Sequence, residues 1–260
     1  MTRFQTSLVV LFATLAFAAA PDGRAADPAP LKVGVTPIFP PVIYKEGGKF
    51  AGVEADFAKI LGEELGRPVQ FVDVKWEDQI PALVDGRTDI IMSGMSVTRA
   101  RELRIAFSKP WLIIGQMALV RREDAYRYAL GFPANPSGTI GVLKATTGDF
   151  LVQQEFPANE RKTYTAAEDA AKALKKKRVD LFLCDAPTIW WLAGLHETDG
   201  LVAVPIFITQ EQLAWGVRRS DTDLLNSVNA ALEKLQQSGR ANATIKRWIP
   251  MFQPQSSPKP

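Results

Sequence analysis

The residues from Ser93 to Trp111 bring hydroxyls, backbone amides and guanidinium groups close together in the sequence. Gly94 allows the backbone to approach a ligand closely, and the hydroxyls of Ser96 and Thr98 can cap a short helical turn. A helix N-terminus favours negative charge, and arginine binds a carboxylate through two parallel hydrogen bonds. The segment therefore predicts a carboxylate-binding site. Its candidate cations are Arg99, Arg101 and Arg104.

Two further positions could contact a small polar ligand. Thr146 and Thr147 open a predicted helix, so their hydroxyls and amides can form a second carboxylate site or simply cap that helix. Asp185 ends an apolar strand just before another predicted helix. An aspartate in that place is either a helix cap or a carboxylate exposed at the end of a strand, and the pattern alone leaves both interpretations open.

The first 26 residues have the pattern of an export signal. Arg3 precedes an apolar run from Leu8 to Ala20, and small residues follow. The run is too short to span a bilayer, and we expect cleavage near Ala25 or Ala26. Because no cysteine lies near that position and no second apolar run follows, we expect a mature periplasmic protein without a lipid anchor.

Composition excludes several classes of function. The net charge of +3 is small and evenly spread, which argues against nucleic acid as a partner. The single histidine, His196, argues against histidine-dependent catalysis and against a metal site built from several histidines, so we expect a structural role for it. The single cysteine, Cys184, lies in an apolar strand and is expected to be a small buried side chain. We expect neither a metal nor a cofactor.

Strand and helix patterns alternate along the chain, which predicts an α/β fold with helices on both faces of its sheets. In such folds ligands bind at the carboxyl ends of the strands. The first half is expected to contain strands at 31–35, 69–74 and 88–92, and helices at 53–65 and 76–85 with Ile80, Leu83 and Val84 facing inward. The second half is expected to contain strands at 138–143, 179–184 and 201–205. Its expected helices are a helix after Thr147 and those at 166–177, 186–195 and 223–237, and a last turn is expected at 244–249.

Two long apolar strands are expected at 111–120 and 210–217. The tail, residues 253–260, is rich in proline and serine and is expected to be disordered.

Several separate motifs resemble one family, the family 3 periplasmic solute-binding proteins of ABC importers for polar amino acids. The segment Gly94-Met-Ser-Val-Thr-Arg-Ala-Arg101, followed by Phe107-Ser-Lys-Pro-Trp111, is similar to its main signature. The segments Gly52-Val-Glu-Ala-Asp56 and Ile80-Pro-Ala-Leu83, the latter followed by Gly86 and Asp89, match two further motifs. The resemblance extends from Leu31 to Trp248.

The resemblance implies a two-domain type II periplasmic binding protein fold, with the two apolar strands crossing between the domains as a hinge. Domain 1 would comprise residues 27–114 and 213–252, and domain 2 residues 115–212. It also implies roles for single residues: Arg101 would hold the ligand α-carboxylate and Asp185 its ammonium, while Phe39 and Trp76 would form apolar walls. The other expected ligand-binding residues are Gly94, Ser96, Thr146 and Thr147. The family has Gly-Thr-Thr where this chain has Ala145-Thr146-Thr147.

One position bears on specificity. Family members that bind basic amino acids carry an acidic residue just after the first strand, where this chain has Thr36. On that position alone, we expect a neutral or aromatic ligand.

The resemblance leaves three functions to compare. The first is an amino-acid-binding monomer, not an enzyme, that serves an inner-membrane ABC permease. The second is a cyclohexadienyl or arogenate dehydratase on the same fold, which would need a general acid in a D-A-x-E segment. Here that segment is Asp185-Ala-Pro-Thr188, and threonine cannot be that acid. The third is a ligand sensor that acts through a separate membrane receptor.

Overall fold

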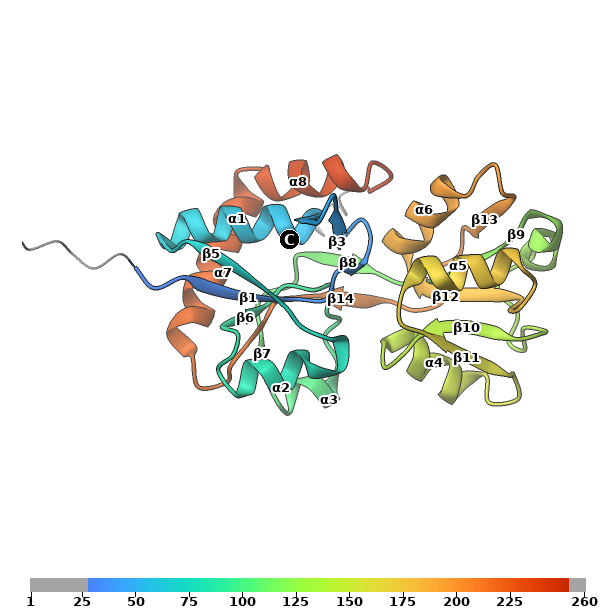
Figure 1. Cartoon of the computed structure of the whole chain (residues 1–260), viewed down its shortest axis with the longest axis horizontal. Coiled ribbons are helices and arrows are strands. Elements are labelled where there is room, and N and C mark those ends of the chain that lie inside the picture. The colour runs from blue at the N-terminus through green and yellow to red at the C-terminus, as the bar shows by residue number, and fades with distance from the viewer. Residues whose placement is uncertain (1–27, 253–260) are drawn as a thin grey trace, which may run out of the picture.

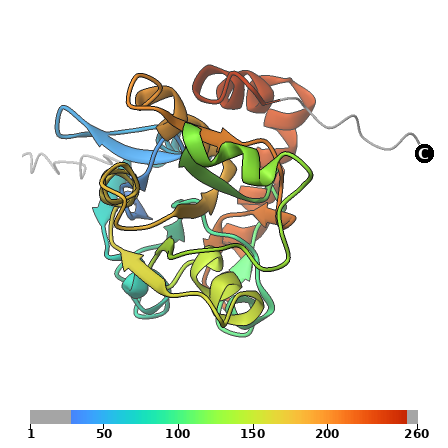
Figure 2. The ribbon, with the colours of Figure 1, turned by 90° about the vertical axis from the view of Figure 1, so that its right-hand side faces the viewer.

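The computed structural model describes residues 28–252, so the predicted signal peptide and tail lie outside the described residues. The chain forms two lobes side by side, each built on a five-stranded sheet (Figure 1). The first lobe contains both ends of the described chain. Figure 2 shows the second lobe facing the viewer. The expected α/β class is confirmed.

The first sheet has the order β5-β1-β6-β15-β7. Its first three strands are parallel, and β15 runs antiparallel to both of its neighbours. The strand bounds are β1 Leu31–Val35, β5 Val69–Asp73, β6 Ile90–Ile91, β7 Ala106–Phe107 and β15 Gly216–Val217. Helices cover both faces, as expected, with α1, α7 and α8 on one side and α2 and α3 on the other (Figure 1). Their bounds are α1 Val53–Leu65, α2 Gln79–Val84, α3 Arg99–Glu102, α7 Thr222–Gln237 and α8 Arg240–Trp248.

The second sheet has the order β11-β10-β12-β9-β13, with β9 antiparallel to both neighbours. The strand bounds are β9 Gln116–Arg121, β10 Ile140–Leu143, β11 Arg161–Tyr164, β12 Leu181–Asp185 and β13 Leu201–Val204. The helices are α4 Thr147–Glu155, α5 Ala167–Lys175 and α6 Ala186–Leu195, and a 3-10 helix, η2, spans Arg122–Tyr128. The edge strand β11 was not anticipated, because its residues Arg161-Lys-Thr-Tyr164 are mostly polar and only alternate partly buried side chains face the core.

Two short strands cross between the lobes. β8 (Leu112–Ile114) pairs antiparallel with β14 (Glu211–Leu213), in the register Glu211 to Ile114. Each is part of a longer strand expected from the sequence, and each is interrupted. Gly115 separates β8 from β9, and a Cβ there would lie 2.1 Å from the carbonyl oxygen of Thr209, so the two segments cross too closely for a side chain. Ala214 and Trp215 separate β14 from β15, and the Trp215 amide donates to the Ser108 hydroxyl instead of continuing the ladder.

Local patterns predicted most of the remaining elements. The helix expected at 76–85 begins as a 3-10 turn, η1 (Trp76–Asp78), before α2. Val84 was expected to face inward, and this was wrong: it is the last residue of α2 and its exposed fraction is 51%. Gly47 and Gly48 form the turn between β3 (Ile43–Glu46) and β4 (Lys49–Ala51), which form a small sheet with β2 (Ile38–Phe39). Helix α8 begins four residues before its expected start at Thr244.

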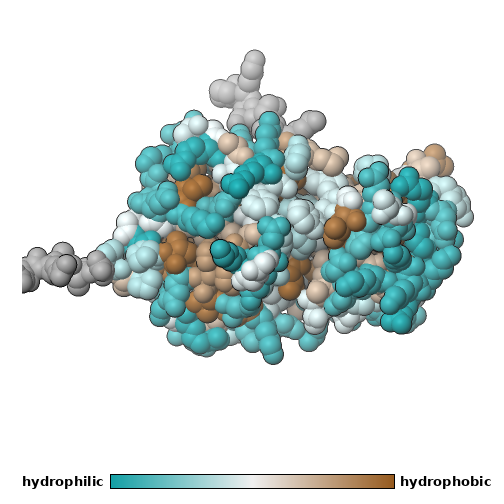
Figure 3. Space-filling view, turned by 45° about the horizontal axis from the view of Figure 1, so that its top comes forward, coloured by the Kyte–Doolittle hydropathy of each residue, from teal (hydrophilic) through white to brown (hydrophobic). Residues whose placement is uncertain are grey.

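The face of the molecule that Figure 3 shows is largely hydrophilic. On the face in Figure 3, hydrophobic residues form only small patches, most of them on the lobe at the left. Within residues 28–252, no helix is long and apolar enough to cross a membrane.

Candidate functional site

The loop after β6 positions Arg101. Gly94 adopts a positive φ of 65°, and its amide donates to Oε2 of the buried Glu54 at 2.6 Å, so this amide is not free for a ligand. Thr98 caps α3, and its hydroxyl accepts from the Arg101 amide at 3.3 Å. The guanidinium of Arg101 then folds back, donates to the carbonyl oxygen of Ser96 at 2.7 Å and lies over the Trp76 ring at 5.3 Å.

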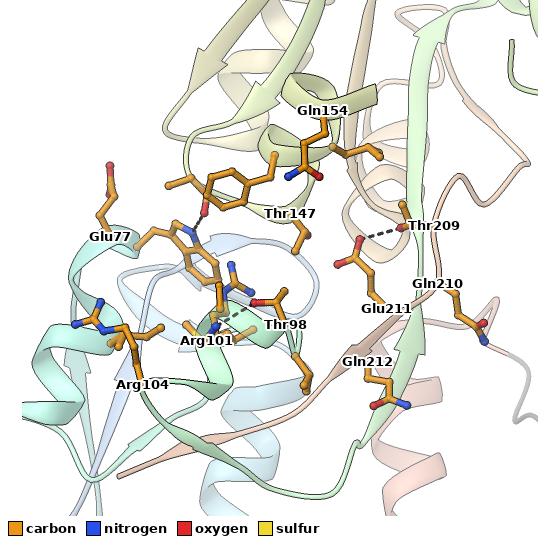
Figure 4. Close-up of a pocket in the computed structure, with 18 of the residues that line it drawn as sticks. Glu77, Thr98, Arg101, Arg104, Thr147, Gln154, Thr209, Gln210, Glu211 and Gln212 are labelled. Atoms are coloured by element: carbon orange, nitrogen blue, oxygen red, sulfur yellow. Dashed lines mark hydrogen bonds between the residues drawn. The ribbon is translucent and has the colours of Figure 1, made fainter. Parts of the chain in front are cut away.

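Arg101 differs from the two neighbouring arginines in its surroundings. Arg99 and Arg104 are exposed, whereas Arg101 is partly buried. Burial lowers its pKa, and the nearby carboxylates of Asp185 and Glu211 act in the opposite direction. Burial and carboxylate neighbours thus distinguish Arg101 as the cation inside the cleft (Figure 4).

The second lobe contributes the start of α4. The Thr146 hydroxyl accepts from the Asp149 amide at 3.3 Å and donates to the Leu143 carbonyl at 2.7 Å, so it is an ordinary helix cap. Thr147, in contrast, accepts from Gln116 Nε2 at 3.2 Å. Ala145, just before them, has a φ of 60°, a left-handed conformation that favours glycine. Of the two threonine hydroxyls, that of Thr147 is the one directed toward the other polar groups of the cleft.

Asp185 is not a helix cap. It precedes α6, yet its side chain makes no capping bond and instead accepts from Gln116 Nε2 at 2.6 Å. Burial raises its pKa to about 7; the nearby Glu211 carboxylate also raises it, while Gln116 and Arg101 act in the opposite direction. The carboxyl therefore faces the cleft and not the helix that it precedes.

Two polar residues of this site were missed by sequence analysis. Gln116 and Glu211 lie on the segments that cross between the lobes, and Gln116 Nε2 reaches Glu211 Oε1 at 3.1 Å. Gln116 is the one polar side chain in the apolar run 111–120, whereas Glu211 lies between Gln210 and Gln212 at the start of 210–217. An amide that interrupts an apolar strand is the signal that could have identified Gln116, and no comparable local signal marks Glu211.

Two aromatic residues close one side of the site. The rings of Phe39 and Trp76 meet edge to face, with 5.1 Å between their centroids, and both side chains are buried. Trp76 Nε1 donates across the cleft to the Ala145 carbonyl at 2.9 Å. Nearby, Lys144 and Glu77 form an ion pair at 3.0 Å between the lobes. These contacts hold the two lobes together beside Arg101.

A small cavity joins the two lobes at this point. All eight predicted ligand-binding residues line it, together with one further residue, Cys184. Cys184 is buried, as expected, and burial raises its pKa. The cavity opens beside a much larger one of about 1080 Å³, whose lining includes Trp76, Arg101, Thr147 and Glu211 (Figure 4). This volume is slightly above the usual range of roughly 300–1,000 Å³ for small-molecule pockets.

The remaining candidates of the sequence have structural roles. His196 faces Asp199 at 2.9 Å and Glu168 at 3.1 Å, and thereby ties the end of α6 to α5. Thr188 is fully buried in α6. Within residues 28–252, no group of three or more histidine, cysteine or acidic side chains is arranged to hold a metal ion.

This site lies between the two lobes at the carboxyl ends of β1, β6, β10 and β12, which is where open α/β sheets bind their ligands. Residues 31–251 match the family of bacterial extracellular solute-binding proteins, family 3. The chain belongs to this family, as the sequence motifs indicated.

Individual proteins of known function or structure are similar to this chain in sequence or in fold. The L-cystine-binding protein TcyJ of Escherichia coli (strain K12) is 25% identical over 226 residues, which are 84% of this chain and 82% of that protein. The ancestral amino acid-binding protein AncCDT-1, a precursor of cyclohexadienyl dehydratase, is 30% identical with a TM-score of 0.76; the match covers 84% of this chain and 94% of that one.

A binding component of an ABC transporter from Wolinella succinogenes, solved with lysine, is 26% identical with a TM-score of 0.79, and the match covers 84% of this chain and 94% of that one. These neighbours share the type II periplasmic binding protein fold that the resemblance implied.

Proposed function

We propose that this protein binds an α-amino acid between its two lobes and delivers it, from the periplasm, to an ABC permease in the inner membrane. The observation that carries the proposal is the pairing of charges in the cleft. The Arg101 guanidinium comes from one lobe and the Asp185 carboxylate from the other, and both line one small cavity. A zwitterion needs both a cation for its carboxylate and a carboxylate for its ammonium.

In this proposal Arg101 holds the α-carboxylate and Asp185 the ammonium. Thr147, Ser96 and the neighbouring backbone would complete the polar contacts, while Phe39 and Trp76 would pack on the apolar part of the ligand. Gly94 would allow the close approach of the loop without donating its amide, and Thr146 would position the start of α4, because the Gly94 amide and the Thr146 hydroxyl already have partners inside the protein. The domain boundaries near residues 114 and 212 belong to the same proposal.

Calorimetry with purified protein and a panel of amino acids tests this function. Arg101→Ala should weaken binding at least tenfold, because a charge-assisted hydrogen bond to a buried site contributes about 1.5–3 kcal/mol. Arg99→Ala is the matched control, since Arg99 is exposed on the same helix, and it should bind as the wild type does. An Arg101→Ala protein with unchanged affinity would refute the assignment.

The dehydratase alternative has one observation in its favour. A carboxyl with a pKa near 7, such as Asp185, could protonate a leaving hydroxyl. Charge argues against it: prephenate carries two carboxylates, whereas the site offers one arginine beside the two carboxylates of Asp185 and Glu211. We therefore expect purified protein to leave prephenate and arogenate unchanged in an ultraviolet absorbance assay.

A further inference from the structure

Glu211 projects into the cleft from the crossing strand β14. Its two oxygens accept hydrogen bonds from Ser96 Oγ at 2.7 Å, Thr209 Oγ1 at 2.8 Å and Gln116 Nε2 at 3.1 Å. All three donors are neutral. Among residues 28–252, no lysine, arginine or histidine lies within ion-pair distance of Glu211 or Asp185.

One amide group joins the two carboxylates. Gln116 Nε2 donates to Asp185 at 2.6 Å and to Glu211 at 3.1 Å. The amide cannot rotate by half a turn, because its oxygen would then face both carboxylates. Gly148 leaves room for this orientation, since a Cβ there would lie 2.6 Å from Gln116 Oε1. Two carboxylates are thus fixed side by side around a single neutral donor.

The inner part of the site has more negative than positive charges. The inner part of the site contains one cation, Arg101, and two carboxylates, Asp185 and Glu211. A zwitterionic amino acid neutralises Arg101 with its carboxylate and one carboxylate with its ammonium, and the other carboxylate is left without a cation. Of the charges at the rim, Glu77 is paired with Lys144, and Arg104 is exposed, where salt screens it.

We propose that Glu211 is a specificity-determining residue and that the ligand is a cationic α-amino acid whose side-chain cation faces Glu211. The inference rests on the proposed function. The larger cavity next to Arg101 has room for a long side chain, and Trp76, Ile113 and Phe150 line it for the methylene groups. A neutral ligand was expected on the basis of Thr36 alone. The Thr36 hydroxyl donates to the Val74 carbonyl and accepts from Gln79 Nε2, so it already has hydrogen-bond partners inside the protein. In this proposal Glu211 of β14 supplies the carboxylate that family members for basic amino acids carry just after the first strand, at the position of Thr36.

Matched ligand pairs test the inference. Calorimetry should compare arginine with citrulline, its neutral isostere, and lysine with 2-aminoheptanoate, whose side chain has the same length without the charge. Wild-type protein should bind the cationic member of at least one pair about tenfold more tightly or better, a ratio that corresponds to about 1.4 kcal/mol. In Glu211→Gln the ratio should fall to about threefold or less, because the amide keeps the size of the side chain and removes its charge.

Glu77→Gln is the matched control. Glu77 lines the same cavity but is paired with Lys144, so its loss should leave the ratio unchanged. Thermal unfolding should show that both variants are folded. Equal affinity for charged and neutral isosteres in the wild type, or a ratio that survives in Glu211→Gln, would overturn this inference and leave the proposed function standing. Failure of every amino acid in a full panel to bind would overturn both.

Discussion

Glu54 supports the ligand loop from inside the first lobe. The side chain is fully buried, and its carboxyl accepts from the Gly94 amide. Burial raises its pKa to about 8, while the Gly94 amide and the indole groups of Trp111 and Trp215 act in the opposite direction. No charged side chain contributes to this shift. A buried acid with a raised pKa makes the stability of the protein depend on pH.

The pKa of Glu54 in the folded and in the unfolded protein determines whether stability rises or falls with pH. In the unfolded chain the pKa of Glu54 is near 4.5, and in the folded protein it is about 8, so the folded state binds more protons between these values. The stability contributed by Glu54 is therefore complete at low pH and is lost as the pH rises toward 8. Glu54→Gln should remove this dependence, which can reach about 1.4 kcal/mol per pH unit.

Urea unfolding of wild type and Glu54→Gln between about pH 5 and about pH 8 measures the effect. With rising pH the free energy of unfolding of the wild type should fall relative to that of the variant, because only the wild type carries the titrating Glu54 carboxyl. Asp185 titrates in the same range but is present in both proteins, so it cancels in the comparison. A difference that stays constant over this pH range would contradict the assignment.

Among the elements, the connection from β10 to α4 is strained at Ala145. Its φ of 60° costs about 1–2 kcal/mol for a residue with a Cβ, and its carbonyl is the acceptor for Trp76 across the cleft. We expect Ala145→Gly to raise the free energy of unfolding by roughly 0.5–1 kcal/mol, because relief of strain exceeds the added entropy of the unfolded glycine.

A second substitution in the same backbone conformation provides the control. Gly66 ends α1 with a φ of 61°, and a Cβ there would meet no atom within 4 Å, so Gly66→Ala tests the backbone alone. It should destabilise by about 1 kcal/mol in the same thermal or urea unfolding experiment. If both substitutions change stability in the same direction, strain at Ala145 is not the cause.

At the scale of the whole molecule, β8 and β14 cross between the two lobes, and we expect one lobe to rotate relative to the other about these strands. A ligand held by Arg101 from one lobe and Asp185 from the other contacts both lobes only when they are close together. Such a ligand shifts the equilibrium toward the closed form, because only differential contact shifts an equilibrium. Hinge closure of this kind is known in periplasmic binding proteins.

Small-angle scattering should show a smaller radius of gyration when a bound amino acid saturates the wild type. Arg101→Ala should show no change at the same ligand concentration, because it lacks one half of the contact between lobes. Tryptophan fluorescence should change as well, and Trp76→Phe should reduce that change, which separates Trp76 from the other five tryptophans. Saturation without a change in either signal would indicate a rigid pocket.

The sequence by itself determined the class of fold, most of the helices and strands, and two of the three charged residues of the inner site, Arg101 and Asp185. Alternating burial in a strand and the 3.6-residue period in a helix are local, so β1, α1 and α7 follow from neighbouring residues alone. Arg101 and Asp185 were found because each belongs to a motif or to a strand end that can be recognised within a few residues. Gly66 likewise marks the end of α1 by its own conformational freedom.

Only the tertiary structure decided which hydroxyls, amides and carboxylates meet. Gln116 and Glu211 are 95 residues apart, and the antiparallel register of β8 with β14 brings their segments together. A one-residue shift of that register would turn Glu211 to the opposite face of the strand, because side chains alternate along it. The second carboxylate of the site, and with it the charge expected of the ligand, therefore depends on a pairing between distant segments that no local pattern encodes.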